Sequence, residues 1–367
     1  MTQKAKFLLQ SIRGERLDMI IETCSKRKDQ GFVLIFVLWM LAILSLLVAS
    51  LADVVEDLQT QVYESQQARE ERFGLLGVQE TLLYLASVKS GSVAGLRLTY
   101  DRTNTDDLDP FMATWADQIS GNELGLDGRV YLTKDDYLFS LQDAGSLISL
   151  RSENTKLLTR LIASARLSRA ESNVLIANLK DYVDRDEDRR IDGAEKKEYL
   201  EASYIEPTNR FLTNPWQLNN VMGWGKVVDR NPDFLREVSI YPFELKNYNS
   251  MTKKRMLLMD GSSNEVAENI VNYREKNFFR NWQQVQDIAG NLNSDAKAEV
   301  NYLASHYLRI RLSKVASNVV TWLSVTLTPR SKTAPWEIDY QFVREIEEDD
   351  REDFTNAREV PPYGIYR

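Results

Sequence analysis

The stretch that decides the fold runs over residues 26–52 and reads KRKDQGFVLIFVLWMLAILSLLVASLA. It opens with a Lys-Arg-Lys cluster at residues 26–28, and residues 32–52 carry no charge. As a helix, an apolar run of about 21 residues rises roughly 30 Å, which matches the hydrocarbon thickness of a bilayer. We therefore expect residues 32–52 to cross a membrane once.

The basic cluster sets the expected orientation of this span. Positive charge next to a span stays in the cytoplasm, so the bulk of the chain after Asp53 should lie on the other side. Residues 50–52, Ser-Leu-Ala, are also similar to a secretory cleavage site, and a soluble exported protein that begins at Asp53 is the alternative. Against it, the apolar run is longer than the roughly 7 to 15 residues of a secretory signal, and its periodicity continues past the site. The residues that continue it, which we expect to contact a partner helix, are Val54, Val55, Leu58 and Val62.

Composition argues against two classes of function. A net charge of −8 disfavours nucleic-acid binding, because phosphate contacts need clustered Lys and Arg. The single histidine, His306, lies next to apolar residues with no obvious Ser or Cys partner, so an enzyme is not expected. The single cysteine, Cys24, precedes the apolar run, so no disulfide forms within the rest of the chain.

The chain beyond the span predicts a sheet with a helical insertion. We expect the first helix to continue to about Val88, and a loop rich in Asp, Asn and Thr follows at residues 100–110. Val, Ile, Thr and aromatic residues predict strands in six segments, which are residues 129–133, 137–141, 147–150, 306–312, 319–328 and 336–344. Residues 153–303 between them have a helical pattern.

Within the insertion, residues 216–223 and 283–290 share an apolar, apolar, glycine spacing, and each predicts a short helix that ends at its glycine. Between them, residues 251–277 predict a helical hairpin similar to hairpins that hold nucleic-acid phosphates. Because the chain is acidic, we interpret this hairpin as a packing element.

A candidate metal site lies in the acidic stretch 184–195. Carboxylates occupy positions one, three, five, nine and twelve of a calcium-loop pattern, although Arg189 stands where that loop has a glycine. Hard oxygen ligands suit calcium. The predicted ligands are Asp184, Asp186, Asp188, Asp192, Glu195 and the backbone carbonyl of Arg190. The alternative is an exposed acidic loop whose charge nearby arginines offset.

The junction at residues 26–35 resembles the leader junction of type IV pilins and pseudopilins. The resemblance implies that a prepilin peptidase cuts after Gly31, so that Phe32 becomes the new N-terminus and its amine is methylated. Most of these proteins carry a glutamate at the fifth mature position, and here that residue is Phe36. This departure is typical of the type II secretion minor pseudopilin K, which is placed at the filament tip.

The resemblance extends over nearly the whole chain, since the helical insertion and the Gly-Ala-Glu at residues 193–195 are similar to that family. It implies an α+β, pilin-like fold in which a long transmembrane and spine helix packs on an antiparallel sheet interrupted by a large α-helical insertion domain. The expected parts are the leader 1–31, the span 32–52, the spine continuation 53–90, the first sheet part 91–152, the helical insertion 153–303, the last strands 304–345 and an acidic tail 346–367.

The implied function is that of a minor pseudopilin which caps the periplasmic pseudopilus of a type II secretion system and helps to initiate its assembly. The implied partners are the I and J minor pseudopilins, the major pseudopilin G, the prepilin peptidase and inner-membrane lipid, with the bulk of the chain in the periplasm. The minor pilin of a type IV pilus remains an alternative.

Overall fold

The computed structural model describes residues 4–88, 91–98, 119, 121–231, 233–259, 261–290, 292 and 300–361, and for residues 4–32 it describes the backbone alone. The loop expected at residues 100–110 lies outside the described residues. The chain divides after Arg72 into two compact units, which are considered separately below.

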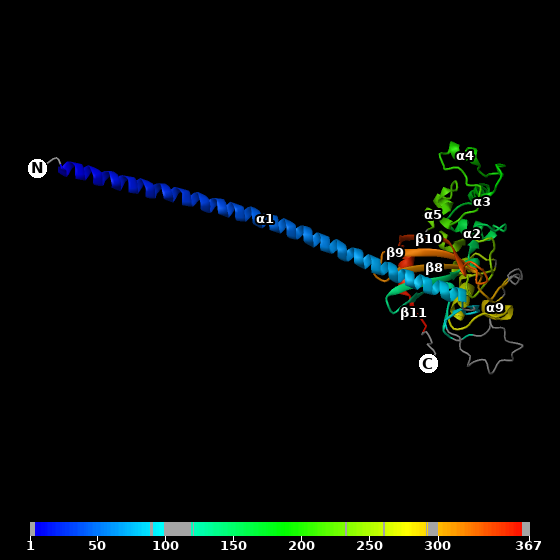
Figure 1. The fold of residues 1–367 in the computed structure, drawn as a ribbon. Coiled ribbons are helices and arrows are strands. Elements are labelled where there is room, and N and C mark those ends of the chain that lie inside the picture. Colours follow the sequence, from blue (N-terminus) through cyan, green and yellow to red (C-terminus); the bar gives the residue numbers. More distant parts are fainter. Residues whose placement is uncertain are drawn as a thin grey trace. The chain divides into compact units, whose positions relative to one another are not determined.

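The first unit consists of most of α1 (Lys4–Val88), drawn in blue in Figure 1. Its described apolar side chains, from Val33 to Val62, are exposed. This is one helix near the N-terminus that is long and apolar enough to cross a membrane. α1 ends at Val88, the residue expected from the sequence.

The second unit is built on a six-stranded sheet with the order β10-β9-β8-β5-β4-β11. Its strands are β4 (Asp127–Leu132), β5 (Tyr137–Asp143), β8 (Tyr307–Lys314), β9 (Val319–Leu327), β10 (Trp336–Glu345) and β11 (Arg358–Glu359). All neighbours are antiparallel except β11 and β4, which are parallel. The five long strands expected from the sequence are present, with ends shifted by about two residues or less.

The sheet is covered on both faces, and β8 shows how. Its side chains alternate between the faces because a strand has a period of two. Leu308, Ile310 and Leu312 belong to the apolar cluster that includes Leu82 and Leu83 from the end of α1. Between them, arginines 309 and 311 are also buried, so the opposite face must supply partners for their charge.

Short strands complete the β structure. β1 (Gly91–Ser92), β2 (Gly95–Arg97) and β3 (Glu123–Leu124) form a small sheet, while β6 (Ile148–Ser149) pairs with β7 (Val238–Ser239). The strand expected at residues 147–150 is therefore only two residues long. It follows the 3₁₀ turn η3 (Ala144–Ser146), in which the Gly145 amide donates to the Asp143 carboxylate.

The carboxylate of Asp143, at the end of β5, also holds the segment between the two helical lobes and the segment that leads into β8. It accepts hydrogen bonds from the hydroxyl groups of Ser250, at 3.0 Å, and Ser305, at 2.5 Å. Burial raises the pKa of this carboxyl, while these hydrogen bonds oppose the shift. The chain thus leaves β5 and returns to its neighbour β8 around one buried acid.

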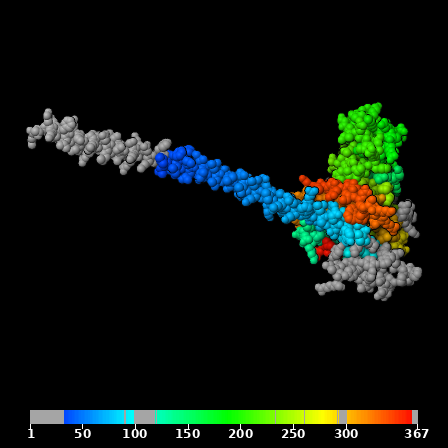
Figure 2. Space-filling model, viewed as in Figure 1, coloured from blue at the N-terminus to red at the C-terminus, as the bar shows by residue number. Residues whose placement is uncertain are grey.

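The helices between β6 and β8 form two lobes with separate apolar clusters. The first helical lobe contains α2 (Lys156–Ser164), α3 (Arg169–Val183), α4 (Lys196–Glu201), η4 (Pro215–Asn220), α5 (Gly225–Arg230) and α6 (Phe234–Glu237). The second helical lobe contains α7 (Lys253–Leu257), α8 (Asn264–Arg274) and α9 (Trp282–Ala289). In Figure 2 the first lobe is the green mass that stands out beside the orange strands.

One of the two predicted glycine stops is confirmed. Gly290 is the C-cap of α9, and its φ angle of 71° lies in a backbone region that favours glycine. The other prediction was wrong in position, because η4 ends at Asn220 with Val221 as its C-cap, and Gly223 lies further along the chain. The hairpin made by α7 and α8 packs into the second lobe, where Met256, Ala267 and Ile270 are buried.

The chain from residue 346 to residue 361 is more ordered than the acidic tail expected from the sequence. It contains α10 (Glu348–Thr355) and then β11. Asp350 is fully buried, and its oxygens lie 3.0 Å from an Arg311 nitrogen and 2.6 Å from an Arg344 nitrogen. α10 therefore supplies the anion that the buried Arg311 of β8 requires, whereas Arg309 donates to the backbone carbonyls of Arg236 and Val238.

Candidate functional site

The candidate partner-contact residues lie on one face of α1. Val54, Val55, Leu58 and Val62 have exposed fractions of 53%, 45%, 54% and 55%. Because residues i, i+4 and i+8 lie along one side of a helix, they form a continuous apolar stripe. Gly31 and Phe32 lie within the α1 backbone, but their side chains are outside those described.

The candidate metal site lies between α3 and α4 in the first lobe. α3 begins with a capping box, in which the Ser168 hydroxyl accepts from the Glu171 amide and the Glu171 carboxylate accepts from the Ser168 amide. α4 begins after Glu195, whose amide donates to the Glu198 carboxylate. The loop 184–195 therefore begins at Asp184, the C-cap of α3, whose amide donates to the Lys180 carbonyl, and it ends at the N-cap of α4.

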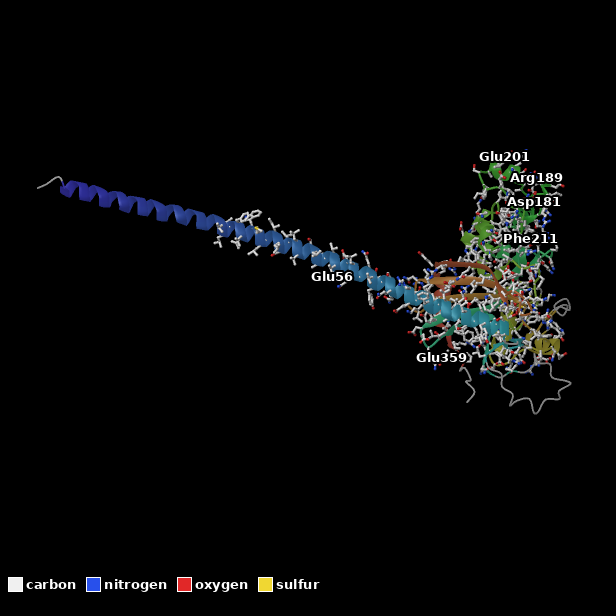
Figure 3. All side chains as sticks on the ribbon, viewed as in Figure 1. Glu56, Asp181, Arg189, Glu201, Phe211 and Glu359 are labelled. Carbon is white, nitrogen blue, oxygen red and sulfur yellow. The ribbon has the colours of Figure 1, made fainter. Side chains whose placement is uncertain are left out.

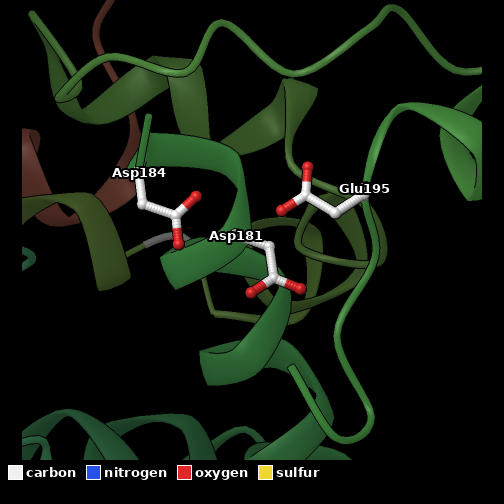
Figure 4. A group of neighbouring side chains, drawn as sticks. All are labelled: Asp181, Asp184 and Glu195. Carbon is white, nitrogen blue, oxygen red and sulfur yellow. The ribbon is translucent and has the colours of Figure 1, made fainter. Parts of the chain in front are cut away.

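Three carboxylates from this region converge, as Figure 4 shows. One oxygen each from Asp181, Asp184 and Glu195 lies within 4.8 Å of the other two. Asp181 comes from the last turn of α3 and is fully buried. Gly193 approaches it so closely that an added Cβ would lie 2.0 Å from an Asp181 oxygen. The spacing of the three oxygens suits ligands that share one cation.

Arg190 supplies part of the positive charge at this acidic group. One of its guanidinium nitrogens lies 2.7 Å from an Asp181 oxygen and also hydrogen-bonds to Asp184. The backbone amide of Arg190 donates to Asp181 at 3.1 Å. These contacts raise the pKa of the Arg190 guanidinium.

The single positive charge of Arg190 does not neutralise the three carboxylates. An oxygen of Asp184 and an oxygen of Glu195 are buried and accept no hydrogen bond from the described residues. Burial, followed by the charges of Asp181 and Asp184, raises the pKa of Glu195 to about 7. Near neutral pH the site thus favours a further positive charge, either a proton or a metal cation.

The structure brings together only part of the predicted calcium set. Asp184 and Glu195 face each other, whereas the side chains of Asp186, Asp188 and Asp192 are exposed and lie outside the group of three. The backbone carbonyl of Arg190 accepts from the Gly193 amide at 3.0 Å. Asp192 has a φ angle of 65°, so the loop turns back at this residue.

Asp181 was missed because it precedes the loop pattern and belongs to a helix. A signal for it was present, since Asp181 and Asp184 are three residues apart at the end of α3, where helical neighbours lie on the same side. Such pairs are common on exposed helices, and the sequence does not distinguish this buried one.

Comparisons with known proteins agree with this architecture. Residues 138–229 match the family model of type II secretion system (T2SS) protein K. A comparison with curated proteins finds no match. Among solved structures, a chain of the GspK-GspI-GspJ complex from the enterotoxigenic Escherichia coli type 2 secretion system matches with 14% sequence identity and a TM-score of 0.50. The match covers 78% of this chain and 100% of that chain.

Proposed function

We infer that the chain is a protein K of a type II secretion system, acting as a minor pseudopilin, because the family match and the fold match support the same component. The matched residues 138–229 run from β5 to α5 and include the acidic loop 184–195. The N-terminal apolar helix, long enough to cross a membrane, agrees with this assignment.

We propose that the fold is pilin-like in detail. In support, the last turns of α1 bury Leu82, Leu83 and Leu85 in one cluster with the antiparallel strands β8 and β9. Two helical lobes inserted between neighbouring strands of that sheet then account for the size of the chain.

We propose that the chain occupies the pseudopilus tip and binds the I and J minor pseudopilins, with the major pseudopilin G below them. The matched structure contains GspI and GspJ together with GspK. A glutamate inside the hydrocarbon is costly unless it is paired. A subunit with nothing above it has no neighbouring amine to pair with, and this chain has Phe36 at that position.

We propose further that the prepilin peptidase cuts before Phe32 and that the new amine is methylated. In this proposal the leader lies in the cytoplasm and the helical lobes lie in the periplasm. Lys26, Arg27 and Lys28 support this orientation, because basic residues flank spans on the cytoplasmic side. The chain would remain in the inner membrane through residues 32–52. Its role would be structural, with no catalytic step.

Helix contact is testable on the apolar stripe of α1. Replacing both Leu58 and Val62 with Asp places two charges on the proposed contact face, and recovery of the I and J components with the membrane-extracted chain should fall at least tenfold. The control replaces Thr60 and Gln67 with Asp, since these residues lie on the opposite side of the helix, and recovery should be unchanged. Unchanged recovery with Leu58→Asp and Val62→Asp would contradict the assignment, and recovery of type IV pilus components instead would favour a minor pilin.

We propose that the acidic group binds calcium, with Asp181, Asp184 and Glu195 as its core ligands. Asp186, Asp188, Asp192 and the carbonyl of Arg190 are the remaining loop oxygens that could complete the six to eight ligands calcium takes. The two buried oxygens without hydrogen-bond donors support a cation here. Bound calcium would supply the positive charge that holds the loop against α3.

A further inference from the structure

A cleft of about 550 Å³ opens in the first helical lobe, between α3, the segment 150–158 and the loop 209–211. Its floor is apolar, and Leu150, Leu158 and Leu179 there have exposed fractions of 7%, 2% and 2%. Figure 3 labels Phe211, at the rim, in the same lobe as Asp181. The volume lies within the range of about 300 to 1,000 Å³ that ligand pockets have.

The rim of this cleft is basic, although the chain as a whole is acidic. Five cationic side chains line it, against two carboxylates, and these cations are Arg151, Lys180, Arg185, Arg190 and Arg210. Two of the five are already paired: Arg190 with Asp181 and Asp184, and Lys180 with Glu153 at 3.6 Å. Arg151, Arg185 and Arg210 form no ion pair within the part of the chain that the structure describes.

Arg151 stacks on an aromatic ring at the rim of the cleft. Its guanidinium carbon lies 3.7 Å from the centroid of the Phe211 ring, so the cation stacks on an aromatic face. Its Nε atom is buried and donates to no described acceptor. A stacked guanidinium presents its N–H groups in a fixed plane, which is the geometry that a carboxylate accepts.

We propose that this cleft binds an exposed peptide segment of another protein, one in which a carboxylate stands next to a large apolar side chain. The apolar side chain would lie on the floor over Leu158 and Leu179, and the carboxylate would accept from Arg151, with Arg185 and Arg210 contributing charge. The complementarity of a basic rim to an acidic peptide selects this class. A polyanionic nucleic acid does not fit, because the net charge of −8 repels it beyond the cleft. The inference depends on neither calcium binding nor the tip position.

The proposal is tested with the full chain in lipid nanodiscs and an array of hexapeptides in which Asp or Asn stands next to Leu or Phe. Binding is measured by fluorescence anisotropy of the labelled peptides. At least one Asp peptide should bind ten times more tightly than its Asn counterpart. Arg151→Gln should reduce that affinity about tenfold, while Arg330→Gln, an exposed change outside the cleft, should not change it.

A second variant distinguishes a loss of binding from a loss of folding. If the melting temperature of Arg151→Gln falls, Arg210→Gln on the exposed rim replaces it, and a loss of at least threefold is expected. The proposal is overturned if Asp and Asn peptides bind equally, if no peptide in the array binds, or if neither arginine variant changes the affinity. These outcomes are independent of partner recovery, so they do not bear on the pseudopilin assignment.

Discussion

Gly193 shows how closely single residues are fitted around the acidic group. Its position admits no side chain, because a Cβ would lie 2.0 Å from an Asp181 oxygen. The loop can therefore turn against the end of α3 and bring Glu195 to Asp181 and Asp184. Burial and the nearby charges of Asp181 and Asp184 raise the pKa of the Glu195 carboxyl to about 7.

The calcium proposal makes different predictions for two aspartates. After chelation, calcium at about 100 times its dissociation constant should stabilise the full chain by about 2.7 kcal/mol. For a folded unit of this size, that corresponds to a rise of about 4 °C in melting temperature. Asp181→Asn should remove most of the rise, because Asp181 belongs to the group of three and is fully buried. Asp188→Asn should keep most of it, because Asp188 is exposed.

Comparing Asp181→Asn with Asp188→Asn also distinguishes the observed group of three carboxylates from the linear calcium-loop pattern. Loss of the calcium response in Asp188→Asn with retention in Asp181→Asn would favour the loop pattern over the observed geometry. If the wild-type chain shows no rise at all, the acidic stretch is a loop whose charges are offset by its own arginines.

At the residue scale, the sequence predicts those ligands that a linear pattern contains. Asp184 and Glu195 stand at the two ends of the calcium pattern, and the structure brings both into the group. The side chain of Arg190 could not be assigned in this way, because its contacts with Asp181 and Asp184 depend on how the loop folds back. The stacking of Arg151 on Phe211 joins residues far apart in sequence, and no local spacing reveals it.

Among the elements, α10 depends most on a buried ion network. Asp350 pairs with Arg311 and Arg344, while Asp353 also contacts Arg311 at 2.9 Å. Burial lowers the pKa of Arg311, which shows the cost of holding this cation away from water. The helix is therefore stabilised by charge pairing against the sheet rather than by an apolar face.

Removing the central carboxylate should loosen this helix. Asp350→Asn keeps the shape but removes the fully buried carboxylate that Arg311 and Arg344 share, and leaves them only the more exposed Asp353 and Glu347. The free energy of unfolding should fall by about 3 kcal/mol. Glu348→Gln, which removes an exposed charge from the same helix, should change it by less than about 0.5 kcal/mol. Urea unfolding of the two variants measures both values. Equal effects would contradict a specific role for Asp350.

Elements with an alternating or periodic pattern could be predicted, and those held by charge could not. The long strands β5, β8, β9 and β10 have the Val, Ile, Thr and aromatic content of half-buried strands, and their positions follow from it. Residues 346–361 are rich in Asp and Glu, a composition typical of solvated surface. The burial of Asp350 among them depends on its pairing with Arg311, which lies on β8 about 40 residues earlier, and with Arg344.

At the scale of the whole molecule, the first unit is an apolar helix. The second unit consists of a sheet with two helical lobes, each with its own apolar cluster. The sequence predicts a single helical insertion, because periodicity identifies helices but does not assign them to cores. Which helices share a core depends on contacts between distant residues. Tyr248 and Phe279, for example, lie in the second lobe, and Phe234 lies in the first.

The tip position predicts where the lobes lie in an assembled filament. A gold label attached to a cysteine introduced at Ile205, an exposed residue of the first lobe, should mark one end of each isolated pseudopilus. The same label on the major pseudopilin should mark the whole shaft and serves as the control. Labels on this chain along the shaft would contradict a capping role.

The central claim, that this chain is a pseudopilin processed in the inner membrane, is tested most directly by its mature N-terminus. Mass spectrometry of protein recovered from membranes of cells with and without the prepilin peptidase should find a methylated Phe32 at the start of the chain only when the peptidase is present. A soluble product that begins at Asp53, or a chain that still begins at Met1 in the presence of the peptidase, would contradict the account.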